Sequence, residues 1–69
     1  MKQTSKERIA KNVKMLRESK KLTREALSLI LGFENSYISK LEKEKINVTI
    51  ERLDKIASFF EIKTIDLLG

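Results

Sequence analysis

Polar side chains crowd the short stretch between residues 35 and 43. They comprise one amide, two hydroxyls and two cations, namely Asn35, Ser36, Ser39, Lys40 and Lys43. Two apolar residues in the same stretch, Ile38 and Leu41, are three positions apart and so share one face of a helix, which leaves the polar groups on the opposite face. That face can donate and accept hydrogen bonds and attract anions, but has little to offer a protein core.

Catalytic chemistry is poorly represented in the chain. There is no histidine and no cysteine, which removes the commonest general base and metal ligand, any disulfide and any thiolate metal site. We also find no phosphate-binding loop and no convincing pair of carboxylates. We therefore expect no enzyme activity, no metal and no other cofactor.

Positive charge is concentrated at the beginning of the chain. The net charge is +5, and residues 1–24 hold nine Lys and Arg against two acidic residues, whereas residues 25–69 hold six against eight. A polyanion would therefore approach the first segment. A lysine-rich helix that is merely solvated fits this composition equally well.

Two short helices joined by a tight turn are expected between Leu22 and Lys45. Thr23 can cap the first with its hydroxyl, and Gly32 follows its last apolar residue, where the chain must turn through positive φ. Phe33 then packs at the turn, and the second helix covers about 35–43. The apolar residues expected to bury the first helix are Leu27, Ile30 and Leu31.

Three further helices are expected around this pair. The first covers 2–20, is capped by Thr4 or Ser5, and buries Ile9, Val13 and Leu16. A loop over 45–48 precedes a helix capped by Thr49, and Thr64 caps a last short helix over about 64–68. The buried face of the helix after Thr49 is expected to contain Ile50, Leu53, Ile56, Ala57 and Phe60. Residues 1–69 are thus predicted to form one compact all-α domain of five helices.

The longest apolar run is Leu29–Leu31, far too short for a membrane span, and no apolar signal-peptide core follows the basic N-terminus. We expect a cytoplasmic protein that does not bind membranes. We expect no effector domain after residue 69, and therefore no small-molecule ligand.

The stretch from Leu22 to Phe60 resembles the helix-turn-helix of the XRE family, the lambda-repressor-like DNA-binding fold, and the similarity extends from about Ile9 to Leu68. It rests on a spacing of apolar and small residues followed by a polar tail. These residues are Leu27, Ser28, Leu31, Gly32, Phe33, Ile38 and Leu41, then Glu42, Lys45 and Asn47. The SYIS run and the INVTI loop are also similar to restriction-modification controller proteins, and other XRE regulators share both.

The resemblance implies that the helix over 35–43 enters the major groove of double-stranded DNA, while the helix after Thr23 crosses the backbone with its N-terminus toward phosphate. The positions that contact bases in the family are occupied here by Arg24, Asn35, Ser36 and Lys40. Those expected at the DNA backbone are Thr23, Tyr37, Ser39, Lys43 and Lys45. Groove chemistry independently allows Asn35 to pair with adenine and Lys40 with guanine. The alternative for each is an exposed polar side chain without a partner.

The resemblance further implies a partly buried ion pair between Arg17 and Glu42; the alternative is two surface charges.

Three departures from the family pattern stand out. Glu34 replaces the usual small capping residue, which leaves its role open, and Ser28 replaces the usual alanine, where its hydroxyl can bond a carbonyl of its own helix. Leu29 and Ile30 occupy normally charged positions, and we expect them to fold against a neighbouring helix rather than to bind a partner.

We expect a sequence-specific transcriptional regulator, a repressor or autoregulator, that acts as a homodimer on a palindromic operator. The C-terminal helix over 64–68 is expected to dimerise, because its end of the chain is more apolar than one short helix needs. The interface residues are then Phe59, Ile62, Ile65 and Leu68; the alternative is a monomer in which all four fold back onto the helix after Thr49. The alternative is an antitoxin or adaptor that binds a protein through Leu29, Ile30 and these C-terminal aliphatic residues.

Overall fold

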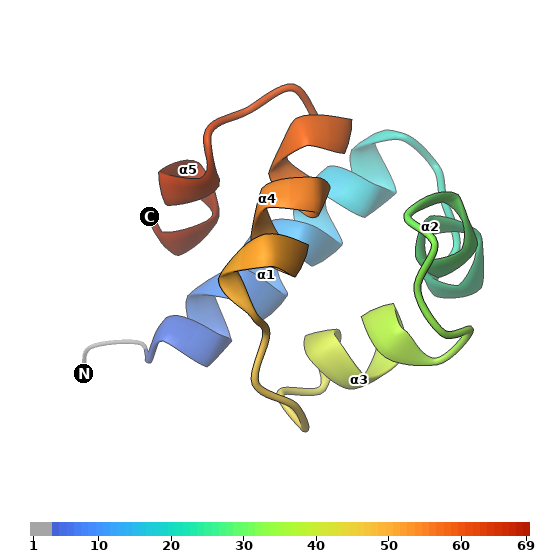
Figure 1. Cartoon of the computed structure of the whole chain (residues 1–69), viewed down its shortest axis with the longest axis horizontal. Coiled ribbons are helices and arrows are strands. Elements are labelled where there is room, and N and C mark those ends of the chain that lie inside the picture. Colours follow the sequence, from blue (N-terminus) through green and yellow to red (C-terminus); the bar gives the residue numbers. More distant parts are fainter. Residues whose placement is uncertain (1–3) are drawn as a thin grey trace.

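The computed structural model describes residues 4–69, and within that range it contains α-helices and no strand (Figure 1). The helices are α1 (Ser5–Ser19), α2 (Arg24–Ile30), α3 (Tyr37–Glu42), α4 (Ile50–Phe59) and α5 (Thr64–Leu68). The prediction of a five-helix all-α fold is confirmed. The predicted start of the first helix at Lys2 lies outside the described residues. No helix in residues 4–69 is long and apolar enough to cross a membrane.

Three of the helices are capped at their N-terminus by a threonine, as predicted. The Thr4 hydroxyl accepts a hydrogen bond from the Glu7 amide at 3.2 Å, and the Glu7 carboxylate accepts one from the Thr4 amide at 3.2 Å, which completes a capping box. Thr23 and Thr49 accept from the amides three residues later, at 3.0 and 3.2 Å. Each bond satisfies a backbone donor that has no partner inside its own helix.

The start of α5 differs from the prediction. Lys63, not Thr64, is the cap residue, and its backbone amide donates to the Asp66 carboxylate at 3.1 Å. Thr64 is the first residue of the helix, and its hydroxyl donates to the Asp54 carboxylate of α4. The hydroxyl therefore joins two helices instead of capping one.

The first four helices all end in the same backbone arrangement. One residue past each C-cap has a left-handed φ: Lys21 (56°), Gly32 (77°), Glu44 (60°) and Glu61 (58°). The amide of the residue after it donates back to a carbonyl in the last turn of the helix, at 2.8–3.1 Å, which is the Schellman motif. Only the turn at Gly32 was predicted, because a side chain disfavours positive φ at the other three positions.

One apolar core joins the helices. α3 packs on α1 and α2, and α5 packs on α1 and α4. The core residues are Ile9, Val13, Leu27, Leu31, Phe33, Ile38, Leu41, Leu53, Ile56, Ala57, Phe60 and Leu67, with Leu16 partly buried against them. The predicted buried residues are thus confirmed, with Ile30 and Ile50 as exceptions.

Leu29, Ile30 and Ile50 are exposed, and the expectation that they fold into the core is wrong. α2 has only seven residues, and its buried face is supplied by Leu27, Ser28 and the C-cap Leu31, so Leu29 and Ile30 point to solvent. Ile50 is the first residue of α4. Val48, ahead of the cap, packs against the core in its place, as in a hydrophobic staple.

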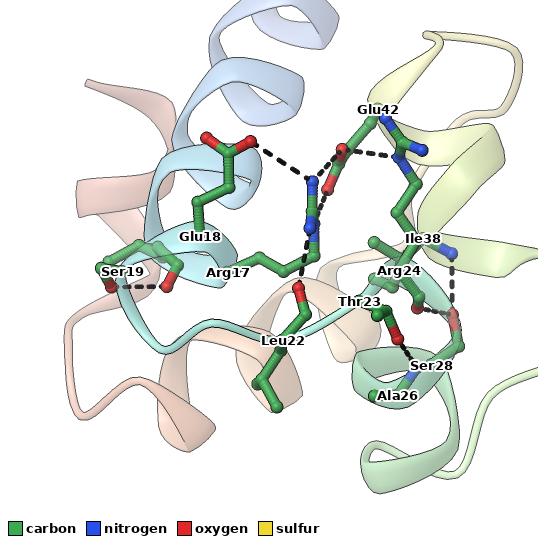
Figure 2. A network of polar contacts seen from close by, with 11 residues as sticks. Arg17, Glu18, Ser19, Leu22, Thr23, Arg24, Ala26, Ser28, Ile38 and Glu42 are labelled. Atoms are coloured by element: carbon green, nitrogen blue, oxygen red, sulfur yellow. Dashed lines mark hydrogen bonds and ion pairs between the residues drawn. The ribbon is translucent and has the colours of Figure 1, made fainter.

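Ser28 joins α2 to the beginning of α3. Its side chain is fully buried, and its hydroxyl donates to the Arg24 carbonyl at 2.9 Å, the bond within its own helix that was predicted. The same hydroxyl also accepts from the Ile38 amide at 3.1 Å (Figure 2). Ser36, at the cap position of α3, makes no side-chain capping bond. The Ser28 hydroxyl of α2 therefore provides an acceptor for the Ile38 amide, a backbone donor that has no partner within α3.

The structure brings Arg17 of α1 and Glu42 of α3 together as an ion pair (Figure 2). The Arg17 Nε and Nη2 atoms donate to the two carboxylate oxygens at 2.7 and 3.1 Å, and Nη1 donates to the Leu22 carbonyl at 2.7 Å. Only 9% and 5% of the two side chains are exposed. The bond to Glu42 raises the pKa of Arg17 above its ordinary value, so the Arg17 guanidinium stays charged at physiological pH.

Arg17→Met should lower the free energy of unfolding by about 3–5 kcal/mol, because it removes the bidentate partner of a buried carboxylate. Urea and thermal unfolding at several salt concentrations measure this, with Arg8→Met, an exposed arginine of α1, as the control that should stay near wild type. An Arg17→Met protein as stable as the parent would show that the pair contributes nothing to stability.

Ser28→Ala should cost about 1–3 kcal/mol, because the buried Ile38 amide loses its acceptor. Equilibrium unfolding in urea measures the loss, and Ser58→Ala, an exposed serine of α4, is the matched control. Because alanine favours helices slightly over serine, the control should be neutral or a little more stable. Equal stability of both variants would rule out the role of Ser28 as a cap for α3.

Candidate nucleic-acid interface

The turn between α2 and α3 is longer than predicted. α3 begins at Tyr37 rather than at Asn35, and it ends at Glu42 with Lys43 as its C-cap. The Tyr37 amide donates to the Glu34 carbonyl at 2.9 Å, a tight turn that precedes the first helical bond from Lys40 to Ser36 at 3.0 Å. Asn35 and Ser36 therefore lie in a turn at the start of α3, and not on its cylinder.

We name the polar set of this region the recognition surface: Asn35, Ser36, Ser39, Lys40 and Lys43. All are exposed except Ser39, which is half-buried. On the opposite side of α3, Ile38 and Leu41 are buried in the core. The helix is thus fixed from behind by apolar packing while it presents amide, hydroxyl and ammonium groups outward, as a helix that contacts a polar ligand must.

A shallow hollow flanks α3 on each side. The α2-side hollow joins Ser39 to the start of α2 and is lined by Arg17, Glu18, Thr23, Arg24, Glu25 and Ser39. The α4-side hollow is lined by Glu34, Ser36, Tyr37, Lys40, Ile46, Asn47 and Arg52. Six of the nine residues expected to contact bases or backbone therefore line one or the other of these two hollows. Lys45 is exposed just beyond its C-terminus.

Arg24 is tied to the buried ion pair. Its Nε donates to the Glu42 carboxylate at 3.1 Å, and 48% of its side chain is exposed. Glu42 thus lies between two arginines, Arg17 behind it and Arg24 toward solvent (Figure 2). A guanidinium has five N–H donors in a rigid fork, so Arg24 can bond Glu42 and still offer donors to a phosphate or a base. The sequence did not predict this second bond of Glu42.

An aromatic and ionic cluster supports the turn before α3. The rings of Phe33 and Tyr37 meet edge to face with centroids 4.8 Å apart, and the Arg52 guanidinium of α4 lies 4.5 Å from each centroid. Arg52 Nη1 also donates to the Glu34 carboxylate at 3.0 Å. The sequence did not predict this cluster. Phe33 and Tyr37 are four positions apart, but no local spacing connects them with Arg52.

The cluster shifts the pKa values of both Glu34 and Tyr37. The Arg52 guanidinium holds the pKa of the Glu34 carboxyl below its ordinary value, so Glu34 is negatively charged at neutral pH. Partial burial raises the pKa of the Tyr37 hydroxyl. The phenol therefore stays protonated, and it can donate a hydrogen bond to an anionic oxygen.

The C-terminal residues expected at a dimer interface differ in their burial. Phe59, Ile62 and Leu68 are half-buried against the core, whereas 69% of Ile65 is exposed. α5 is anchored to the monomer by Leu67, which is fully buried and whose backbone carbonyl accepts from the side-chain Nδ2 of Asn12 at 2.8 Å.

An apolar groove runs between α1 and α5 and was not predicted. It is lined by Asn12, Met15, Leu16, Ser19, Ile62 and Asp66. Met15 of α1 is an exposed apolar side chain, like Ile65 of α5. The groove therefore adds residues of α1 to the apolar surface of the C-terminal end.

Within residues 4–69, no group of carboxylates is close enough to hold a metal ion, and every buried side-chain polar atom has a hydrogen-bond partner. The described part of the chain thus presents polar groups for binding at its surface and none stranded in its interior.

The fold is similar to two solved structures. A hypothetical transcription factor, NHTF, from Neisseria matches with a TM-score of 0.91 at 23% identity, over 96% of this chain and 76% of that one. The restriction-modification controller protein C.AhdI from Aeromonas hydrophila matches with a TM-score of 0.81 at 26% identity, over 90% of this chain and 94% of that one. Comparison with curated protein sequences found no match.

A family model described as helix-turn-helix matches residues 13–68. This range contains the α2–turn–α3 unit, Arg17 and Glu42, and all of α4 and α5. The chain therefore belongs to the helix-turn-helix family, in its XRE-type branch.

Proposed function

We propose that this protein is a sequence-specific regulator that binds double-stranded DNA through α3. The observation that carries the proposal is the arrangement of that helix: Ile38 and Leu41 fix it to the core, and the recognition surface faces outward beside α2. Membership of the helix-turn-helix family supports the same role, since the second helix of such a motif lies in the major groove.

The contacts that we propose follow from side-chain chemistry. Asn35 can pair with adenine through its amide, and Lys40 can donate to guanine, with Ser36 and Arg24 as further base contacts. Thr23, Tyr37, Ser39, Lys43 and Lys45 would donate to phosphates on either side. The excess of positive charge in residues 1–24 would draw the DNA toward α1 and the start of α2.

We further propose that the protein binds as a homodimer joined through its C-terminal end. Ile65 is largely exposed, and with the exposed Met15 and the partly buried Phe59, Ile62 and Leu68 it would form an apolar surface that a second copy covers. Two copies related by a two-fold axis would contact half-sites about one helical turn apart, roughly 34 Å, and so require a palindromic operator.

The regulatory role that we propose is repression or autoregulation. The likeness to C.AhdI, a restriction-modification controller protein, supports the narrower hypothesis that this chain is such a controller. Genes for a methyltransferase and a nuclease beside its own would favour that hypothesis. A toxin gene in the same place would favour an antitoxin.

The exposure of Leu29 and Ile30 favours a second candidate function. Two adjacent aliphatic side chains on the outer side of α2 could contact a protein partner, as an antitoxin or adaptor with this fold would require. Affinity for DNA that is unchanged by Leu29→Ser and Ile30→Ser, and needs no partner, would argue against an exclusively protein-binding role.

Lys40→Ala and Asn35→Ala should each cost about 1–3 kcal/mol on the preferred site and relax base preference there, because they remove base contacts. Lys43→Ala should instead weaken binding to all sequences and lower the salt slope by about one, because it removes a phosphate contact. Site selection from a random DNA pool and titrations at several salt concentrations measure both effects. Equal losses for Lys40→Ala on every sequence would exclude base recognition by Lys40, and circular dichroism should show unchanged folding.

Ile65→Asp should convert a dimer into a monomer at micromolar concentration, because it places a charge in the apolar contact. Sedimentation of both proteins, free and with operator DNA, measures this. Lys63→Gln, which lowers the net charge by the same one unit at an exposed residue just before α5, controls for altered net charge. A wild type that stays monomeric on a site without two-fold symmetry would contradict the dimer.

A further inference from the structure

Glu34 is an acidic residue on the side of the molecule where we expect DNA. It directly precedes Asn35, its side chain is 69% exposed, and it lines the α4-side hollow with Ser36 and Lys40. A carboxylate so close to a duplex would be repelled by the phosphates, so its position needs an explanation beyond solubility. The bond between Glu34 and Arg52 does not by itself explain this position, because most of the Glu34 side chain remains exposed to solvent.

Arg52 fixes the direction of the Glu34 carboxylate. The guanidinium itself packs against the rings of both Phe33 and Tyr37, 4.5 Å from each centroid, and only 33% of the Arg52 side chain is exposed. It donates to one carboxylate oxygen of Glu34, Oε2, at 3.0 Å. A carboxylate has about four acceptor positions, so this bond orients the group and leaves acceptors for a ligand.

The chemistry of the groove narrows what such a group can bind. An ionised carboxylate only accepts hydrogen bonds. In the major groove the donors are the exocyclic amino groups, N4 of cytosine and N6 of adenine, whereas guanine and thymine present acceptors at the corresponding oxygens. If Glu34 faced guanine O6 or thymine O4, its carboxylate oxygen and the base oxygen would both be acceptors, and no hydrogen bond could form between them.

We propose that Glu34, held by Arg52, is a specificity-determining residue that accepts a hydrogen bond from a base amino group in each half-site and disfavours sites that lack one. This inference rests on the proposed function and deepens it. Glu34 then acts in two ways: it stabilises the matching site through one bond, and it weakens binding to all other DNA through charge repulsion.

Glu34→Gln tests the proposal, because glutamine keeps the shape and can both donate and accept. Selection from a random pool should show wild-type preference for cytosine or adenine at one position next to that contacted by Asn35. The variant should lose that preference by roughly 5- to 100-fold. Duplexes that differ only at this position, with cytosine, adenine, guanine or thymine, distinguish the two amino groups.

The affinity for generic DNA provides a second readout that a purely structural role would not produce. Glu34→Gln should raise it by more than Glu61→Gln does. The control removes the same charge from the exposed connection between α4 and α5, at the far end of the molecule from α3 (Figure 1). A structural role would lower affinity for operator and generic DNA alike, and that result, or an unchanged base preference, would overturn this inference alone. A wild type that selects no site would overturn the proposed function as well.

Discussion

The buried carboxylate of Glu42 is the interaction on which the arrangement of the first three helices depends. Arg17 brings α1 to it and Arg24 brings α2 to it, while Arg17 also binds the Leu22 carbonyl in the connection between those helices. An ionised group with only 5% of its side chain exposed is tolerated because both its oxygens are bonded. The Glu42 carboxylate that joins α3 to α1 through Arg17 therefore also orients the partly exposed guanidinium of Arg24.

The turn before α3 is supported by neighbouring helices rather than by its own residues. Ser28 of α2 accepts from the Ile38 amide, and Arg52 of α4 contacts Phe33, Glu34 and Tyr37. A turn held from both sides presents its side chains in one geometry, which lowers the entropy lost when they bind a ligand. A residue that never touches the ligand can thus affect recognition as strongly as one that does.

Local signals predicted the elements of this fold, but not the contacts between distant residues. Thr23, Thr49 and Gly32 act within one turn of the chain, and their roles could be recognised from neighbouring residues. The Arg17 and Glu42 pair was expected only through family resemblance. The Glu34 and Arg52 residues are 18 positions apart, so no local spacing predicts their pairing. Periodicity predicts a helix that includes Asn35 and Ser36, because it cannot distinguish a turn from the first residues of a helix. Ile50 was misassigned because Val48 was equally suited to the core.

The residues with left-handed φ that follow the first four helices also affect which substitutions this chain can accept during evolution. The turns at Lys21, Glu44 and Glu61 are closed by main-chain hydrogen bonds, so most side chains are acceptable there at a modest conformational cost, and glycine would lower that cost. Because these three positions are exposed, a lineage can alter its surface charge at them without disturbing the packing of the helices. Drift at the helix ends could thus tune long-range attraction to a polyanion separately from the residues that discriminate one site from another.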